Sequence, residues 1–416
     1  MKTVKLDERL YRTEGENGVT VLSEVLPGVR SVAIGVWVRS SSAHEDVGKM
    51  GVSHLLEHMV FKGTERRSAR DIALELEGRG GALDAFTGRE YTSYQARVLD
   101  EDLPRALDVL TDLVRNPTLR DSDLELERKV VLEEISTVED TPDDLVFDVH
   151  SRALWPNHPY GYSILGTRDT VTDLSASDLR ALHERAYHPR HVIITAAGSL
   201  NHDLLLKLVS KCGWFTCEAG PEPPSVSPVP QAGRESQRVQ RETVQAHIVL
   251  GTDTFPYRDR RREPLILLNT VLGGGMSSRL FQRVREELGL AYAIHTHQSF
   301  YHETGTTGVY VGTHPATADQ AVDVILDELR TLANEGLSSA QLLEAKRQLR
   351  GQVTLSLESP AARMYRLATV ALYGEPYRTI DQILADIDAV STEDVAAVAR
   401  EFFDPDRQTV VWLGPN

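Results

Sequence analysis

Cysteine is scarce in this sequence and long apolar runs are absent, and both features restrict what the chain can be. Only Cys212 and Cys217 occur among 416 residues, which suits a reducing compartment and favours free thiols over a disulfide framework. No run of 18 apolar residues is present, so a membrane-spanning helix is not expected. The first 18 residues contain no apolar core, so a signal peptide is not expected there. Together these features predict a cytoplasmic protein.

Basic residues are also few relative to acidic ones. The chain has 45 Lys and Arg against 61 Asp and Glu, a formal net charge of −16. Nucleic acid is bound by clustered basic residues, so it is not an expected partner. The acidic balance is compatible with a basic peptide substrate, although acidic surfaces commonly serve solubility alone. With 41% apolar residues, a chain of this length can bury the cores of two or more domains.

The chain does contain the sequence HLLEH at residues 54–58. Successive helical residues are about 100° apart, so His54, Glu57 and His58 leave one face of a helix. Two imidazoles on one face can bind one Zn²⁺, and a carboxylate that is not a ligand can take a proton from a zinc-bound water. The order H-x-x-E-H is that of the inverzincins. A match this short can arise by chance, but the apolar residues around it favour a buried helix, in which such polar groups are costly unless they hold a metal.

A zinc site of this kind needs a third ligand, and a helix predicted at 121–139 offers several. Its apolar residues recur at helical spacing. Glu127 and Glu134 are seven residues apart and fall on nearly one line, so one could ligate zinc while the other orients a ligating histidine. Periodicity alone does not choose among Glu127, Glu133 and Glu134. A solvated acidic helix face would explain all three equally well.

On these residues the chain resembles the pitrilysin-type zinc peptidases, and most closely the short branch that includes the mitochondrial processing peptidase and its bacterial homologues. In that family the third zinc-ligating Glu follows the motif after 75 intervening residues, which here leads to Glu134. The resemblance covers nearly the whole chain. It implies that His54, His58 and Glu134 bind Zn²⁺, that Glu57 is the general base, and that Glu127 supports the ligands without binding zinc itself.

The sequence also indicates an internal duplication. Residues 174–198 and 390–414 align without a gap at an offset of 216, and each predicts a capped helix, an x-Pro turn and a buried strand. A second match relates 106–113 to 321–329. A segment rich in Pro, Gly and Ser has the composition of a linker between the two copies. The expected domains are a zinc-binding catalytic half at 1–216, a linker at 217–234 and a homologous second half at 235–416.

The predicted fold class is α+β, with two homologous α/β-sandwich halves that each consist of a mainly antiparallel sheet covered by helices. The alternating pattern at 31–38 and 91–98 indicates antiparallel strands with one polar face. The expected strands of the first half are 19–25, 31–38, 82–86, 92–98 and 192–196, and its expected helices lie near 50–62, 68–79, 101–115, 121–139, 143–154, 176–187 and 201–211.

The second half contains no H-x-x-E-H motif, and Gln352 falls where Glu134 would, so one zinc per chain is expected. Its Gly-rich segment 273–275 lacks a following G-K-[ST], which favours a turn leading into a helix over a phosphate loop. The resemblance implies that Arg285 and Tyr292, seven residues apart, assist the substrate side of the site. The alternative is a surface Arg and a Tyr at the start of a strand. In the short branch this pair meets the zinc of a partner chain, so a homodimer with composite active sites is expected.

The family holds its peptide substrate by strand addition to the strand after a Gly-Gly pair. The corresponding residues here are Asp84, Ala85, Phe86 and Thr87. The family commonly has Asn in place of Asp84, and an aspartate cannot donate a hydrogen bond to the substrate.

A second set of substrate contacts is implied by the mitochondrial processing peptidase, in which acidic residues recognise an arginine near the cleaved bond. Asp144 and Asp148 lie at the same offsets from the zinc-ligating Glu, so a preference for basic peptides is expected. Acids at the start of a helix are also stabilised by the helix dipole, which explains them without a substrate.

The sequence therefore predicts a zinc-dependent endopeptidase that cuts unstructured or extended peptides. The alternative is a non-catalytic substrate-binding or scaffold subunit of the same fold. The complete set of His54, Glu57, His58 and Glu134 argues against that alternative.

Overall fold

The computed structural model describes residues 1–415, which form two compact units of three chain segments each. Unit 1 consists of Met1–Ile135, Ser163–Val226 and Ser356–Tyr377. Unit 2 consists of Ser136–Tyr162, Ser227–Leu355 and the chain from Arg378 onward.

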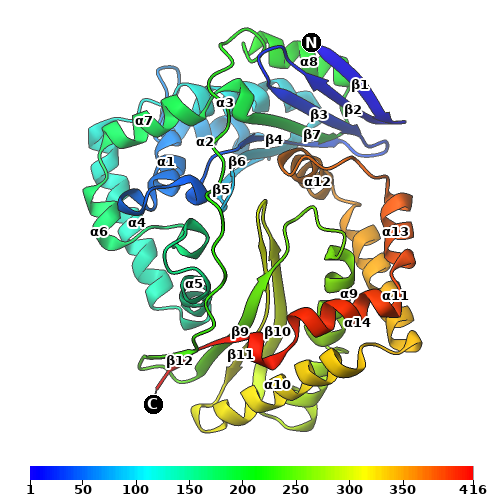
Figure 1. The fold of residues 1–416 in the computed structure, drawn as a ribbon. Helices are drawn as coiled ribbons and strands as arrows, with labels where there is room; N and C mark the ends of the chain where they lie inside the picture. Colours follow the sequence, from blue (N-terminus) through cyan, green and yellow to red (C-terminus); the bar gives the residue numbers. More distant parts are fainter. Residues whose placement is uncertain (416) are drawn as a thin grey trace. The chain divides into compact units, whose positions relative to one another are not determined.

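Unit 1 is built on a seven-stranded sheet with the order β1-β2-β3-β7-β4-β6-β5 (Figure 1). The strands are β1 (Lys2–Asp7), β2 (Leu10–Glu14), β3 (Thr20–Val25), β4 (Ser31–Val38), β5 (Ala82–Thr87), β6 (Thr92–Leu99) and β7 (Val192–Gly198). β3 and β7 run parallel, and the other neighbouring strands run antiparallel. β5 therefore forms one edge of the sheet.

Helices cover both faces of this sheet. They are α1 (Val52–Val60), α2 (Ala69–Glu77), α3 (Leu103–Arg115), most of α4 (Asp121–Glu139), α6 (Arg168–Asp173), α7 (Ala176–Ala186), α8 (His202–Lys211) and α12 (Pro360–Leu372). In β4, Ile34 and Val36 face the large core that includes α1 and α3, whereas Ala33 and Trp37 face α12. The expectation of one polar face on this strand is therefore wrong, because a strand buried on both faces is apolar on both.

Unit 2 contains a five-stranded sheet with the order β10-β11-β9-β12-β8. Its strands are β8 (Gln237–Gln240), β9 (Ala246–Thr254), β10 (Ala291–Phe300), β11 (Gly305–Thr313) and β12 (Thr409–Gly414). Its helices are α5 (Pro142–Leu154), α9 (Arg262–Gly273), the π-helix η6 (Phe281–Glu287), α10 (Ala318–Glu335), α11 (Ser339–Ser356), α13 (Ile380–Ala389) and α14 (Thr392–Phe402). The Gly-rich segment ends α9 and leads by a short turn towards η6.

The two sheets repeat one topology, which agrees with the duplication inferred from sequence. β3-β7-β4-β6-β5 in unit 1 corresponds to β8-β12-β9-β11-β10 in unit 2, with the first pair parallel in each case. α7 and α14 both begin with a capping box, formed by Ser175 with Asp178 and by Ser391 with Asp394. The predicted α+β fold with two mainly antiparallel sheets is confirmed.

α5 and α12 depart from a simple division of the sequence into halves. They are equivalent helices, starting at residues 142 and 360, and each has proline in its first turn. α5 packs on β9 and β12 of unit 2, and α12 packs on β3, β4 and β7 of unit 1. The compact units thus exchange these helices relative to the proposed halves 1–216 and 235–416. The composition of the linker does not predict this exchange, because the exchange depends on which sheet the apolar face of each helix packs against.

The expected strands and helices of the first half lie within two residues of the observed ones. The structure adds β1, β2 and α6, which the sequence analysis did not identify. β1 is exposed along its whole length, and its short sequence has only Val4 and Leu6 as apolar residues. Cys212 and Cys217 are free thiols. Among residues 1–415, no helix is both long enough and apolar enough to cross a lipid bilayer.

Candidate metal centre

α1, the helix that carries the H-x-x-E-H motif, is fixed at its N-terminus by a buried carboxylate. Gly51 precedes the helix with φ of 88°, and a Cβ there would lie 2.5 Å from the carbonyl oxygen of Leu165. Glu45 accepts hydrogen bonds from the backbone N–H groups of Gly51 and Ser53, both at 2.8 Å. It thereby satisfies helix-terminal donors in the way an N-cap side chain does. Burial raises the pKa of Glu45 to about 7. An acidic residue shortly before a glycine-led helix was the only sequence signal for this role.

His54, His58 and Glu134 come together where α1 faces α4. Their ligand atoms lie within 4.8 Å of one another, and they form the one such cluster of potential metal ligands among residues 1–415. Nε2 of each histidine is 3.6 Å from Oε2 of Glu134. That separation is too long for a hydrogen bond but close to the roughly 3.4 Å expected between two ligand atoms of a tetrahedral zinc site. Two imidazoles and one carboxylate are a donor set that fits Zn²⁺.

His54 is almost fully buried, with 7% of its surface exposed. Burial, together with the neighbouring His58, lowers the pKa of His54 to about 3. Its imidazole is therefore neutral near pH 7, which is the form that binds a metal. Nδ1 of His54 has no hydrogen-bond partner among the described residues.

His58, in contrast, is held by a second carboxylate on α4. Its Nδ1 lies 3.2 Å from Oε2 of Glu127, and Oε1 of Glu127 pairs with the ammonium group of Lys62. Of the three glutamates that periodicity left open, Glu134 lies in the cluster, Glu127 lies behind His58, and Glu133 is exposed.

Glu57 lies on the same helix but does not belong to the cluster. Thr87 at the end of β5 donates a hydrogen bond from its hydroxyl to Oε2 of Glu57, at 2.6 Å. Burial raises the pKa of Glu57; the Thr87 hydrogen bond and His58 oppose this, whereas Glu134 adds to it. A half-buried carboxylate with a raised pKa is suited to accepting a proton and returning it.

The residues proposed to pair with a substrate lie on the edge strand β5. Asp84 is exposed, and its Oδ1 accepts a hydrogen bond from the N–H of Ala85 at 2.9 Å. Phe86 packs edge-on against Trp37, with ring centroids 6.2 Å apart. Thr87 is engaged by Glu57, so its side chain has a role that the sequence analysis did not identify.

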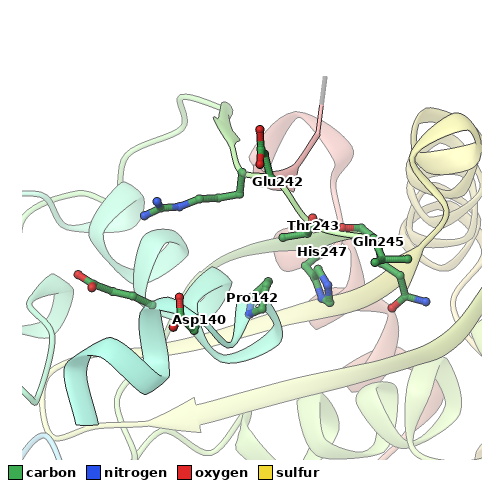
Figure 2. Close-up of a pocket in the computed structure, with 9 residues that line it drawn as sticks. Asp140, Pro142, Glu242, Thr243, Gln245 and His247 are labelled. Atoms are coloured by element: carbon green, nitrogen blue, oxygen red, sulfur yellow. Dashed lines mark hydrogen bonds between the residues drawn. The ribbon is translucent and has the colours of Figure 1, made fainter. Parts of the chain in front are cut away.

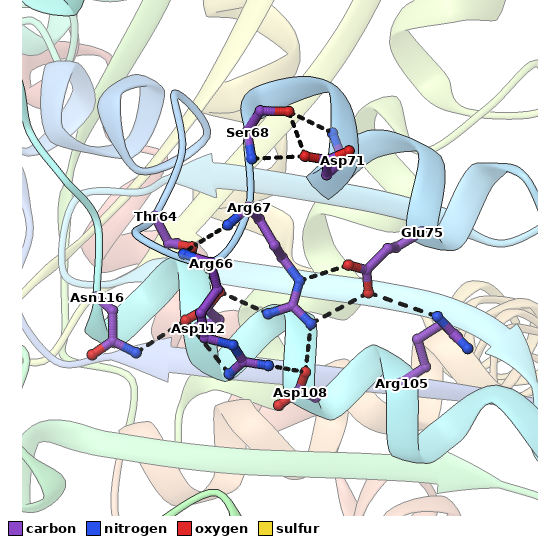
Figure 3. Close-up of polar contacts among 10 residues, drawn as sticks. All are labelled: Thr64, Arg66, Arg67, Ser68, Asp71, Glu75, Arg105, Asp108, Asp112 and Asn116. Atoms are coloured by element: carbon purple, nitrogen blue, oxygen red, sulfur yellow. Dashed lines mark hydrogen bonds and ion pairs between the residues drawn. The ribbon is translucent and has the colours of Figure 1, made fainter.

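The segment that follows α1 is anchored by a buried arginine (Figure 3). Arg67 is 8% exposed and donates hydrogen bonds to Glu75 on α2, at 2.8 Å, and to Asp112 on α3, at 2.7 Å. It also bonds Asp108, and the hydroxyl of Thr64 donates to Asp112 at 2.7 Å. Although burial opposes it, these carboxylates raise the pKa of Arg67. The network ties the chain leaving α1 to two neighbouring helices.

Arg285 and Tyr292 in unit 2 lie side by side. The guanidinium carbon of Arg285 is 4.7 Å from the ring centroid of Tyr292 and 4.6 Å from that of Phe281, distances typical of cation–π contacts. Tyr292 is 76% exposed. Arg285 lies in the π-helix η6, a conformation that is rare and often found at functional sites.

Asp144 and Asp148 lie on α5, with Asp144 exposed and Asp148 half-buried. Near the start of this helix is an open cleft of about 670 Å³ in unit 2 (Figure 2). It is lined by Glu139, Asp140, Pro142, residues 241–245 and His247. Burial, together with Asp143 and Asp144, raises the pKa of Tyr310 on β11 to about 12. The start of α5 is thus an acidic region.

This duplicated fold, with the helix-borne H-x-x-E-H motif facing a glutamate, is that of the pitrilysin-type peptidases. The chain belongs to peptidase family M16. The family model described as "Insulinase (Peptidase family M16)" matches residues 20–168, and that described as "Peptidase M16 inactive domain" matches residues 173–349. The resemblance seen in the sequence is therefore confirmed.

The similarity to known proteins covers nearly the whole chain. "Uncharacterized zinc protease YmxG" of Bacillus subtilis is 41% identical over 94% of this chain and 95% of its own length. An uncharacterized zinc protease of Streptomyces coelicolor is 38% identical over 97% of this chain and 89% of its own. The crystal structure of a protease from Helicobacter pylori superposes with a TM-score of 0.90 at 21% identity, covering 98% of this chain and 100% of that chain, which shows the shared fold.

Proposed function

We propose that this chain is a zinc-dependent endopeptidase that hydrolyses peptide bonds in unstructured or extended peptides. The observation that carries the proposal is the convergence of His54, His58 and Glu134 beside the carboxylate of Glu57. The names of the relatives as zinc proteases support it.

In this proposal His54, His58 and Glu134 hold Zn²⁺. When bound, the ion supplies a Lewis acid that polarises water and the substrate carbonyl. Glu127 fixes the ring of His58 through Nδ1, which leaves Nε2 directed at the cluster.

Glu57 supplies the acid–base chemistry. Its carboxylate takes a proton from the attacking water and later delivers it to the leaving amine. The hydrogen bond from Thr87 holds one carboxylate oxygen in place, so the other oxygen remains available for the proton. Burial raises its pKa, which makes the carboxylate a stronger base towards the attacking water.

An extended peptide adds to the open edge of β5 near Asp84, Ala85 and Thr87. Strand addition is supported by main-chain hydrogen bonds and tolerates many side chains. Arg285 and Tyr292 bind or polarise the substrate from the partner subunit of a homodimer. The exposure of Tyr292 and its contact with the half-buried Arg285 are compatible with that role.

A preference for basic peptides follows from the acids on α5. Asp144 and Asp148 recognise a cationic side chain of the substrate. The adjoining cleft supports the same preference, because its lining has three acids, Glu139, Asp140 and Glu242, against one arginine, Arg241. The two free cysteines are compatible with activity in the reducing cytoplasm.

The test is hydrolysis of a quenched fluorescent, unstructured peptide by the purified protein, before and after removal of metal by a chelator. Activity that disappears on chelation and returns with Zn²⁺ supports the proposal. A protein that binds zinc and cleaves no peptide contradicts it and points to the scaffold alternative. Two peptides that differ only in Arg or Glu beside the scissile bond test the basic preference, and equal rates contradict that preference.

A further inference from the structure

We propose that Lys62 is a positioning residue for the metal centre and acts through Glu127 on His58. The inference rests on the proposed function, because it concerns the same zinc site. Lys62 lies two residues beyond the end of α1 and belongs to none of the sets of residues assigned above to metal, acid–base chemistry or substrate.

The inference rests on three successive contacts that lead from Lys62 to the cluster. The ammonium group of Lys62 pairs with Oε1 of Glu127. Oε2 of the same carboxylate accepts the hydrogen bond from Nδ1 of His58, at 3.2 Å. Nε2 of His58 lies 3.6 Å from Oε2 of Glu134, the next member of the cluster. The two oxygens of Glu127 therefore serve Lys62 on one side and the ligand on the other.

Burial makes the cation necessary. The side chain of Glu127 is only 7% exposed, and a buried carboxylate is costly unless an opposite charge and hydrogen bonds compensate it. Lys62, whose side chain is 33% exposed, supplies that charge. The compensated carboxylate accepts from Nδ1 of His58, which fixes the tautomer in which Nε2 has its lone pair free for a metal.

The neighbouring ligand has no equivalent support. Nδ1 of His54 has no hydrogen-bond partner among the described residues. Of the two histidines in the cluster, only His58 therefore has its ring held from behind, by Glu127 and, through it, by Lys62. Loss of Lys62 therefore acts on the orientation of one of two histidine ligands, and its effect is measurable as zinc affinity.

The experiment compares zinc dissociation constants of the full chain, measured by competition with a chromogenic chelator. Lys62→Met, which keeps the apolar stem, is expected to bind zinc about 10- to 100-fold more weakly, as is usual when the outer partner of a ligand is lost. Lys62→Arg retains the charge and is expected to rescue most of the affinity. Lys49→Met is the matched control, because Lys49 pairs with Asp178 near the other end of α1 and touches no ligand.

A double-mutant cycle shows whether Lys62 acts through Glu127. In a Glu127→Gln background, Lys62→Met is expected to cause no further loss, since the charge it compensates is already gone. Equal zinc affinity of Lys62→Met and wild type overturns the inference, as does an undiminished loss in the Glu127→Gln background. Should Lys62→Met fail to fold, Lys62→Gln takes its place in the same cycle. If the wild-type chain itself binds no zinc, the proposed function fails as well, so the two failures are distinguishable.

Discussion

The hydroxyl of Thr87 donates a hydrogen bond to the carboxylate of Glu57, with 2.6 Å between Oγ1 and Oε2. Thr87 is the last residue of β5, the edge strand on which we propose that the substrate pairs. Glu57 is the proposed general base. This single contact therefore joins the strand that would hold the peptide to the group that would move the proton.

Replacing Thr87 by valine keeps the shape of the side chain and removes the donor to Glu57. We expect kcat to fall about 10-fold, because general-base catalysis depends on the position of the carboxylate. Since the lost hydrogen bond lowers the pKa of Glu57, the acid limb of the pH–rate profile is expected to move to higher pH. Steady-state kinetics between pH 5 and 9 measure both effects. Thr87→Ser is the control and should keep most of the activity, and equal losses in the two variants would show that the hydroxyl has no such role.

Arg67→Met is expected to destabilise the fold strongly. The change leaves Asp112, whose side chain is fully buried, and Glu75 without their shared cation (Figure 3). Removing one partner of a buried ion pair costs about 3–5 kcal/mol in the free energy of unfolding. Urea denaturation followed by circular dichroism measures the loss.

Arg66→Met is the matched control for this network, since Arg66 also pairs with Asp108 and, more loosely at 3.7 Å, with Asp112, but its own side chain is 56% exposed. An exposed pair contributes about 1 kcal/mol or less. Similar losses in the two variants contradict the assignment of Arg67 as the buried anchor.

The proposed composite active site gives a complementation test. Glu57→Gln removes the base, and Arg285→Ala removes the guanidinium that lies on Tyr292. Each variant alone is expected to lose at least 100-fold in kcat/KM while keeping its zinc. When the two chains are co-expressed, a mixed dimer contains one site with both groups intact, so activity should return. Activity of the mixture no higher than the sum of the separate variants contradicts a shared site.

His150 on α5 is expected to make the protein sensitive to acid. It is buried, its Nε2 lies 3.2 Å from the carbonyl oxygen of Thr409, and burial lowers its pKa to about 4 from an ordinary 6.5. Between these values the unfolded chain binds a proton that the folded chain excludes. Stability is therefore complete above pH 6.5 and falls by about 3 kcal/mol as the pH drops to 4.

Denaturation at pH 7, 5.5 and 4.5 measures this dependence. His150→Gln keeps a donor for the carbonyl of Thr409 but cannot titrate, so its stability should depend less steeply on pH than that of the wild type. Identical pH dependence in the two proteins rules out His150 as the source.

Most of the features that were predicted correctly from the sequence follow from local patterns of apolar and polar residues. Helical spacing places His54 and His58 on one face, and the strands and helices of the first half follow apolar periodicity. Periodicity could not choose Glu134 over Glu127 or Glu133, because the choice depends on how α4 faces α1. Only the resemblance to a known family singled it out.

The remaining features depend on contacts between distant residues, which a local pattern does not encode. Glu45 acquires its role from Gly51, 6 positions away, and Thr87 acquires its role from Glu57, 30 positions away. The role of Lys62 comes from its contact with Glu127 on α4. The exchange of α5 and α12 between the compact units likewise depends on which sheet their apolar faces cover.

The most direct test of the central claim compares wild type and Glu57→Gln in hydrolysis of a quenched fluorescent, unstructured basic peptide, with the zinc content of both proteins measured in the same samples. Gln is nearly isosteric and leaves the cluster of His54, His58 and Glu134 intact, but it cannot act as a base. The account predicts equal zinc content and a rate that falls by about 100-fold or more in the variant. Equal hydrolysis by the two zinc-loaded proteins would contradict it.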